Sequence, residues 1–135
     1  GGKGCFFIGH REASEEIYSA LYAAVEQYIV EYGVTEFIVG HYGGFDRLAA
    51  AAVKAAKRST QSKSYLTAAI PSVREADTNA DEFDGTFYPP GMERVPRKAA
   101  IIRANRYVVD HVDYLIALAW HSASNARELV EYAKR

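Results

Sequence analysis

The chain has little of several features that would mark a special class of protein. Its single cysteine, Cys5, cannot form an internal disulfide. The four histidines, at positions 10, 41, 111 and 121, lack the spacing of a metal site. No apolar run reaches the roughly 20 residues that a membrane-spanning helix needs. We therefore expect a cytoplasmic protein with no metal, no cofactor and no membrane segment.

The net charge of the chain is also close to zero. The 135 residues include 16 Lys and Arg and 17 Asp and Glu, a formal charge of −1. A surface that neutralises many phosphates would need an excess of positive charge, so we do not expect nucleic acid as a partner. The length and the 49% of hydrophobic residues suit one globular domain with its own core. We predict a single domain over residues 1–135, and a homo-oligomer stays open.

Short apolar runs that end at glycine or proline alternate with stretches of helical periodicity. The expected strands cover residues 5–8, 34–39, 65–70 and 114–119, and the expected helices cover residues 14–32, 45–58, 96–110 and 126–135. The segment 72–95 has no periodicity and is expected to be a long loop. This alternation predicts an α/β fold, a Rossmann-like three-layer sandwich with a mainly parallel sheet and the strand order 3-2-1-4.

Ligands of such folds bind at the carboxyl ends of the strands, near the point where the strand order reverses. Three expected loops leave that edge, at residues 9–11, 40–47 and 120–125. We expect them to lie together around one binding site.

The loop after the second expected strand is the strongest candidate. It contains Gly40, His41, Tyr42, Gly43, Gly44, Phe45 and Asp46. Its glycines allow close approach of a ligand, and the following helix offers free N–H groups to an anion. The spacing is neither the dinucleotide fingerprint nor the P-loop. A phosphate cradle and a plain tight turn capped by Asp46 therefore both stay open. As a cradle, at least one of Gly43 and Gly44 should hold a backbone angle that other residues avoid, and it should border the main pocket.

Two further groups of residues belong to the same expected edge. They are Gly9, His10 and Arg11 after the first strand, and Ser122, Ser124 and Asn125 before the last helix. The first group would face the crevice or form a solvated loop. The second group would bind an anion or simply cap the helix.

Side chains elsewhere could complete the site. Arg103, Arg106 and Asp110 share one stripe of an expected helix, which suits a phosphate clamp or an ordinary surface ion pair. Aromatic residues that could stack on a base are those in expected loops near the crevice, namely Tyr42, Tyr88 and Trp120. The helix tyrosines are expected to pack in the core and at its rim.

Several motifs occur in a characteristic order along the chain. They are Phe7-Ile8-Gly9-His10-Arg11, residues 40–49, Tyr88-Pro89-Pro90-Gly91, Arg103-Ala104-Asn105-Arg106, Val109-Asp110 and Asp113-Tyr114. Together they resemble the YpsA-like branch of the SLOG superfamily, whose name joins the Smf/DprA proteins and the LOG phosphoribohydrolases. The resemblance extends over nearly the whole chain.

The resemblance implies a Rossmann-like fold with a pocket for nucleotides or for related ligands such as ADP-ribose. By position it assigns ligand binding to Gly9, His10, Arg11, Gly40, Gly43, Gly44, Asp46, Arg103 and Asn105. The chain departs from the family before the last helix, where Ser124-Asn125 stand in place of a glycine pair. Both side chains narrow the approach of a phosphate at that point.

Three hypotheses about function follow. The first is binding or sensing of a nucleotide or nucleotide-derived ligand. The second is a LOG-like phosphoribohydrolase that cleaves the N-glycosidic bond of a nucleoside monophosphate, with Glu131 as the candidate catalytic residue but no glycine-threonine turn beside it. We expect Glu131, about two turns into the last helix, not to reach the crevice. The third is DprA-like binding of single-stranded DNA, which needs a basic groove that this composition does not favour.

Overall fold

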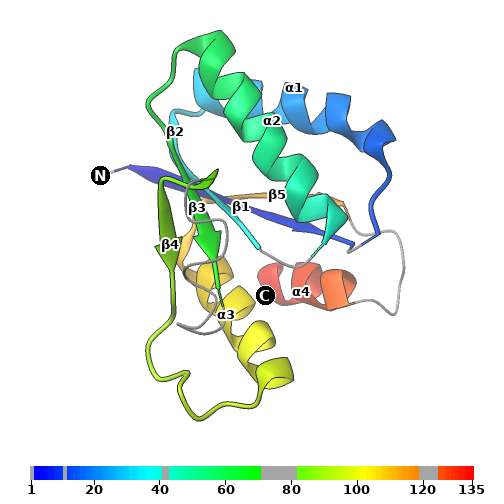
Figure 1. The fold of residues 1–135 in the computed structure, drawn as a ribbon, viewed down its shortest axis with the longest axis vertical. Coiled ribbons are helices and arrows are strands. Elements are labelled where there is room, and N and C mark those ends of the chain that lie inside the picture. Colours follow the sequence, from blue (N-terminus) through cyan, green and yellow to red (C-terminus); the bar gives the residue numbers. More distant parts are fainter. Residues whose placement is uncertain (1, 11, 41–42, 71–81, 119–124) are drawn as a thin grey trace.

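The computed structural model describes residues 2–10, 12–40, 43–70, 82–118 and 125–135. Its elements form a parallel sheet flanked by helices (Figure 1). The strands are β1 (Lys3–Gly9), β2 (Val34–Val39), β3 (Tyr65–Ala69), β4 (Gly85–Phe87) and β5 (Tyr114–Leu118). The helices are the short 3-10 turn η1 (Glu15–Ile17), α1 (Tyr18–Val30), α2 (Gly44–Thr60), α3 (Arg97–His111) and α4 (Asn125–Ala133). The expected α/β fold with a parallel sheet is therefore confirmed.

The sheet has one strand more than the sequence predicts. Its order is β4-β3-β2-β1-β5, and every neighbouring pair is parallel. The four expected strands keep their relative order, but β4 adds an edge strand inside the segment that was expected to be a loop. The N–H of Ile70 donates to the carbonyl of Phe87 at 2.9 Å, so backbone pairing with β3 defines this strand. Three residues are too few to show an alternating pattern, which is why the sequence did not reveal it.

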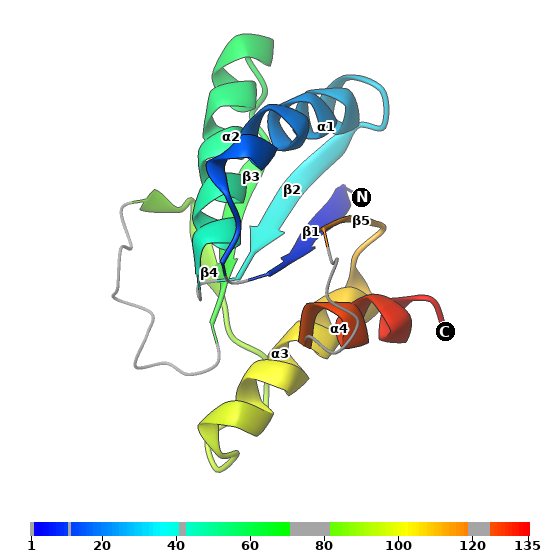
Figure 2. The same ribbon diagram turned by 90° about the vertical axis from the view of Figure 1, so that its right-hand side faces the viewer.

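Successive side chains of β1 point to opposite faces of the sheet. Cys5 and Phe7 pack in the core beneath α1 and α2, whereas Phe6 and Ile8 pack in a second core beneath α3 and α4. Figure 2 shows the two helix pairs on opposite sides of the strands. Because β1 is covered on both faces, it has the continuous apolar sequence typical of a central parallel strand.

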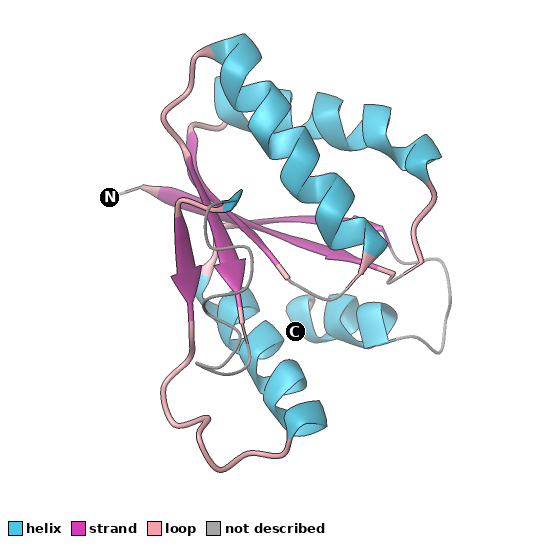
Figure 3. Ribbon diagram, viewed as in Figure 1, coloured by secondary structure: helices cyan, strands magenta, loops and turns pink. Residues whose placement is uncertain are grey.

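The helices begin and end close to the expected positions (Figure 3). Ser14 accepts a hydrogen bond from the N–H of Glu16 and so caps η1, which leads directly into α1. Small residues of α2, including Ala49, Ala52 and Ala56, are fully buried and let α1 and the sheet approach closely. Among the described residues, no helix combines the length and the apolar character needed to cross a bilayer.

Asp84, just before β4, forms hydrogen bonds that hold this edge strand against α2 and β3. Its Oδ2 accepts hydrogen bonds from the backbone N–H of Leu66 at 2.7 Å and from Lys57 Nζ at 2.8 Å. The hydrogen bond from Lys57 and that from the Leu66 amide lower the pKa of the Asp84 carboxyl below its ordinary value. One carboxylate thus joins α2, β3 and the edge strand.

We expect Asp84→Asn to lower the free energy of unfolding at neutral pH by on the order of 0.5 to 1 kcal/mol. The loss is small because 43% of the Asp84 side chain is exposed, so solvent screens its ion pair with Lys57. A lowered pKa stabilises the fold above the unfolded-state pKa, and this contribution is lost as the pH falls through the folded-state pKa. The difference in melting temperature between wild type and variant should therefore shrink between about pH 5 and pH 2. Thermal melts followed by circular dichroism measure it, and a difference that stays constant over this range would contradict the assignment.

Candidate functional site

The carboxyl ends of three strands meet at one edge of the sheet. In the parallel register Phe6 lies opposite Ile38, and Gly9 at the end of β1 lies opposite Leu118 at the end of β5. After β4 the chain crosses to the far side of β1, so the strand order reverses between β1 and β5. The prediction that the candidate loops leave one edge is confirmed for the strand ends that precede them.

The first turn of α2 packs directly on the end of β1. Phe45 is 1% exposed, and a Cβ atom on Gly9 would overlap its ring. Gly9 therefore serves close packing, and Phe45, expected in the ligand loop, lies in the core. The contact determines where the N-terminus of α2 sits relative to the sheet edge.

The glycine turn leads from β2 into α2 without a left-handed residue. Gly43 is the N-cap with a fully extended backbone (φ −178°), and its carbonyl accepts the N–H of Arg47 at 3.2 Å. Gly44 is the first helical residue, and positive φ angles among the described glycines occur at Gly33 and Gly91 instead. The expectation of an unusual backbone angle at Gly43 or Gly44 is wrong, because the helix starts at once and needs only extended and helical backbone.

A carboxylate lies beside this turn, and a buried imidazole follows the end of β1. A Cβ atom on Gly40 would come within 2.9 Å of Asp46 Oδ2. The Asp46 carboxylate therefore packs against the backbone of Gly40, the residue that follows β2. Its place in the first turn of α2 suits the positive end of the helix dipole. His10 follows β1 and is only 7% exposed. The edge thus combines the N-terminus of α2 with a carboxylate and a buried imidazole.

Several predicted residues cannot be placed with these. Arg11, His41, Tyr42, Trp120, Ser122 and Ser124 lie outside the described residues. Asn125 is the first residue of α4. Tyr88 packs against the small core around Met92, Ala100 and Ala104, beside the N-terminal half of α3. In the described ranges, no three residues among His, Cys, Asp and Glu are arranged to hold a metal ion.

The candidates on α3 lie across the sheet from α2. Ala100, Ala104 and Val108 form the buried stripe of α3, while Arg103 is exposed and Asn105 is half-buried. No described contact joins these two residues to the glycine turn. They remain assignments by resemblance.

Arg106 and Asp110 fasten α3 to α4. The hydroxyl of Tyr132 donates to Asp110 at 2.8 Å, and the Arg106 guanidinium carbon lies 5.0 Å from the centre of the Tyr132 ring. The hydrogen bond to Asp110 raises the pKa of the Tyr132 hydroxyl. These contacts favour a structural role for the pair over a phosphate clamp.

Glu131 is engaged on its own helix. Its carboxylate lies 3.0 Å from Arg127 Nη2 and 3.7 Å from Lys134 Nζ, and 48% of the side chain is exposed. The neighbouring Leu129 and Val130 pack against the core beneath α3 and α4. A carboxylate that faces solvent in this way lacks the enclosed position that glycosidic bond cleavage requires.

A cavity on the α3 side of the sheet was not predicted from the sequence, and neither Gly43 nor Gly44, one of which was expected to border the main pocket, lines it. Glu36 of β2, Phe87 of β4 and Tyr107 and His111 of α3 are among its lining residues. The spacing of Tyr107 and His111, four residues apart on one helix, was the available signal. Nothing in the sequence indicated that β2 and β4 supply the opposite wall.

The contact between Gly9 and Phe45 can be tested by a double-mutant cycle. Gly9→Ala should lower the free energy of unfolding by roughly 1 to 3 kcal/mol, because the new methyl group overpacks against the ring. In a Phe45→Ala background the same change should cost much less, since the ring is gone.

Gly4→Ala in the same strand is the matched control for this cycle. Its Cβ would meet Val112 Cγ1 at an ordinary 3.4 Å, so its stability should stay close to that of wild type. Urea denaturation measures all four proteins and the control. Equal costs of Gly9→Ala in both backgrounds would show that the ring does not determine the choice of glycine.

No family model matches the chain, and no curated protein shows significant similarity to it.

Proposed function

We propose that the carboxyl edge of the sheet binds a nucleotide or nucleotide-derived ligand, and that the protein senses or carries this ligand. The observation that supports this proposal most is the meeting of the ends of β1 and β2 with the N-terminus of α2, beside the point where the strand order reverses. Crevices at this position are the usual ligand sites of open α/β sheets.

The N-terminus of α2 is where a phosphate group would bind. The helix has 17 residues and therefore a full macrodipole, with its positive end at the glycine turn. The N-cap is Gly43, so no side chain of the cap residue covers the first-turn N–H groups. Such groups together with the dipole favour an anion.

Asp46 would contact a different part of the same ligand. A carboxylate repels a phosphate, but it accepts hydrogen bonds from hydroxyl groups such as those of a ribose. The Asp46 carboxylate lies toward Gly40, at the end of β2. A phosphate at Gly43 and Gly44 and a sugar at Asp46 would satisfy both requirements.

We include the resemblance to the YpsA-like branch of the SLOG superfamily in this proposal. Its first two ligand loops contain the residues that the structure brings to one edge, namely Gly9, His10, Gly40, Gly43, Gly44 and Asp46. Glu131, which the hydrolase hypothesis needs, is instead ion-paired on the surface of α4. Binding without turnover is therefore the function that the geometry supports best.

We expect Gly44→Val to weaken binding of AMP, ADP or ADP-ribose at least tenfold, about 1.4 kcal/mol, because a branched side chain would stand where the phosphate approaches. The melting temperature should change little, since Gly44 is half-buried with no positive φ. Isothermal titration calorimetry measures the affinity. Gly85→Val on β4, where an added Cβ meets nothing within 4 Å, is the matched control. Unchanged affinity in a folded Gly44→Val protein would show that the turn is only structural.

Turnover can be tested separately. After incubation with nucleoside monophosphates or NAD, we expect no release of free base, as followed by liquid chromatography. Glu131 is paired with Arg127 and Lys134 and is 48% exposed, which does not suit the enclosed carboxylate that such a cleavage needs. Base release that disappears in Glu131→Gln, with fold and affinity intact, would support the hydrolase instead.

A further inference from the structure

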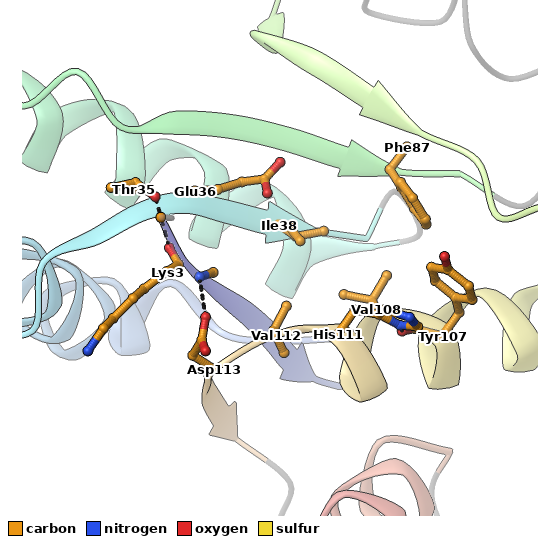
Figure 4. Close-up of a pocket in the computed structure, with 12 residues that line it drawn as sticks. Lys3, Thr35, Glu36, Ile38, Phe87, Tyr107, Val108, His111, Val112 and Asp113 are labelled. Atoms are coloured by element: carbon orange, nitrogen blue, oxygen red, sulfur yellow. Dashed lines mark hydrogen bonds between the residues drawn. The ribbon is translucent and has the colours of Figure 1, made fainter.

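A cavity of about 520 Å³ lies between the C-terminal half of α3 and the sheet (Figure 4). Its lining includes Lys3 and Gly4 at the start of β1, whereas the proposed nucleotide site adjoins Gly9 at the other end of that strand. Its volume falls in the range of small-molecule sites, roughly 300 to 1,000 Å³. The cavity is therefore a second place where this protein could hold a ligand.

One wall of the cavity is a stack of three aromatic rings. The ring centres of Phe87 and Tyr107 are 5.3 Å apart with planes inclined by 26°. Those of Tyr107 and His111 are 4.1 Å apart with planes inclined by 17°. His111 Nδ1 donates to the backbone carbonyl of Tyr107 at 2.7 Å, which holds the imidazole in place. The wall is thus preformed and offers aromatic surface to a flat ligand.

A carboxylate also lines the cavity and has been positioned by a buried hydroxyl. Thr67, which is 5% exposed, donates from Oγ1 to Glu36 Oε2 at 2.7 Å. This leaves Glu36 Oε1 able to accept further hydrogen bonds. In the described part of the chain, no lysine or arginine forms an ion pair with Glu36. Among the residues that the structure describes, no fixed cation therefore balances its negative charge.

The other charged groups of the lining do not compensate Glu36. Lys3 Nζ turns away toward Tyr114, 3.5 Å from its hydroxyl and 5.8 Å from the centre of its ring (Figure 4 shows the side chain leaving the cavity). Asp113 adds a second carboxylate, whose Oδ2 accepts the N–H of Gly4 at 2.9 Å. The cavity therefore favours positive charge.

We propose that this cavity binds a small organic cation, an amine, amidine or guanidine with a flat or apolar body. The charged group would pair with Glu36, and the body would lie against Phe87 and Tyr107. Carboxylates bind amidinium and guanidinium groups through strong, directional hydrogen bonds, and aromatic faces attract cations. Ile38 and Val108 also line the cavity and add apolar surface against which the body of the ligand would pack.

Benzamidine and tryptamine are suitable probes, because each joins an aromatic ring to a cationic group. Titration of ¹⁵N-labelled full chain should give saturable shifts at the backbone amides of Glu36, Tyr107 and His111. Benzamide, the neutral analogue of benzamidine, should bind at least tenfold more weakly, since it cannot form the ion pair.

Glu36→Gln removes the charge and keeps a group that can accept from Thr67, so it should reduce benzamidine affinity at least tenfold without unfolding the protein. Glu16→Gln, an exposed residue of η1, changes the net charge equally and should leave the affinity unchanged. Tyr107→Leu should also weaken binding, because it removes the centre of the aromatic wall.

Absence of saturable binding of both probes would overturn the proposal. So would equal affinity for benzamide and benzamidine, or unchanged benzamidine affinity in Glu36→Gln. Binding of AMP at the carboxyl edge is measured in the same samples. Because the two sites adjoin opposite ends of β1, failure of one proposal is distinguishable from failure of the other.

Discussion

The contact of the Phe45 ring with the bare backbone of Gly9 positions most of what matters in this structure. Burial of a phenylalanine side chain stabilises a fold by roughly 1.5 to 3 kcal/mol, and here that burial occurs at the first turn of α2. The ring can approach so closely only because residue 9 has no side chain. As a result the helix N-terminus is held against the ends of β1 and β2, and the Asp46 carboxylate comes to rest on Gly40. The positions of the helix N-terminus and of the Asp46 carboxylate at this edge thus depend on the contact between Phe45 and Gly9.

The two faces of the sheet are built differently. On the side of α1 and α2, fully buried alanines allow close approach and give a dense apolar core. On the side of α3 and α4 the core is smaller, and part of the cohesion comes from Tyr132, which contacts both Arg106 and Asp110. The less complete packing on this side leaves room for the cavity beside Glu36. The densely packed side of α1 and α2 supports the carboxyl edge of the sheet, whereas the side of α3 and α4 contains the cavity.

β1 therefore connects two environments of opposite character. At its carboxyl end, under the proposed function, the N–H groups at the N-terminus of α2 would bind an anion. Toward its amino end, Glu36 and Asp113 create a region that favours cations. The near-zero net charge of the chain hides this separation, because the opposite preferences arise from backbone dipoles and from side chains that tertiary contacts bring together. The net charge of the chain therefore argues against some classes of partner, but it does not show where on the molecule a charged ligand would bind.

The sequence by itself determined the alternation of strands and helices, the parallel sheet, the relative order of four strands and the edge where the loops emerge. The alternation follows from local patterns, since apolar runs ended by glycine or proline and helical stripes are properties of neighbouring residues. The parallel sheet and the strand order follow from the rules by which alternating strands and helices assemble. Only the tertiary structure decided that Phe45 lies in the core, because its partner Gly9 belongs to another strand. Likewise β4 exists through backbone pairing with β3, and the cavity of Glu36 through a wall supplied by α3. The hydrophobic periodicity of a segment indicates which face of its helix or strand is buried. Which distant residue packs against that face depends on how the whole chain folds.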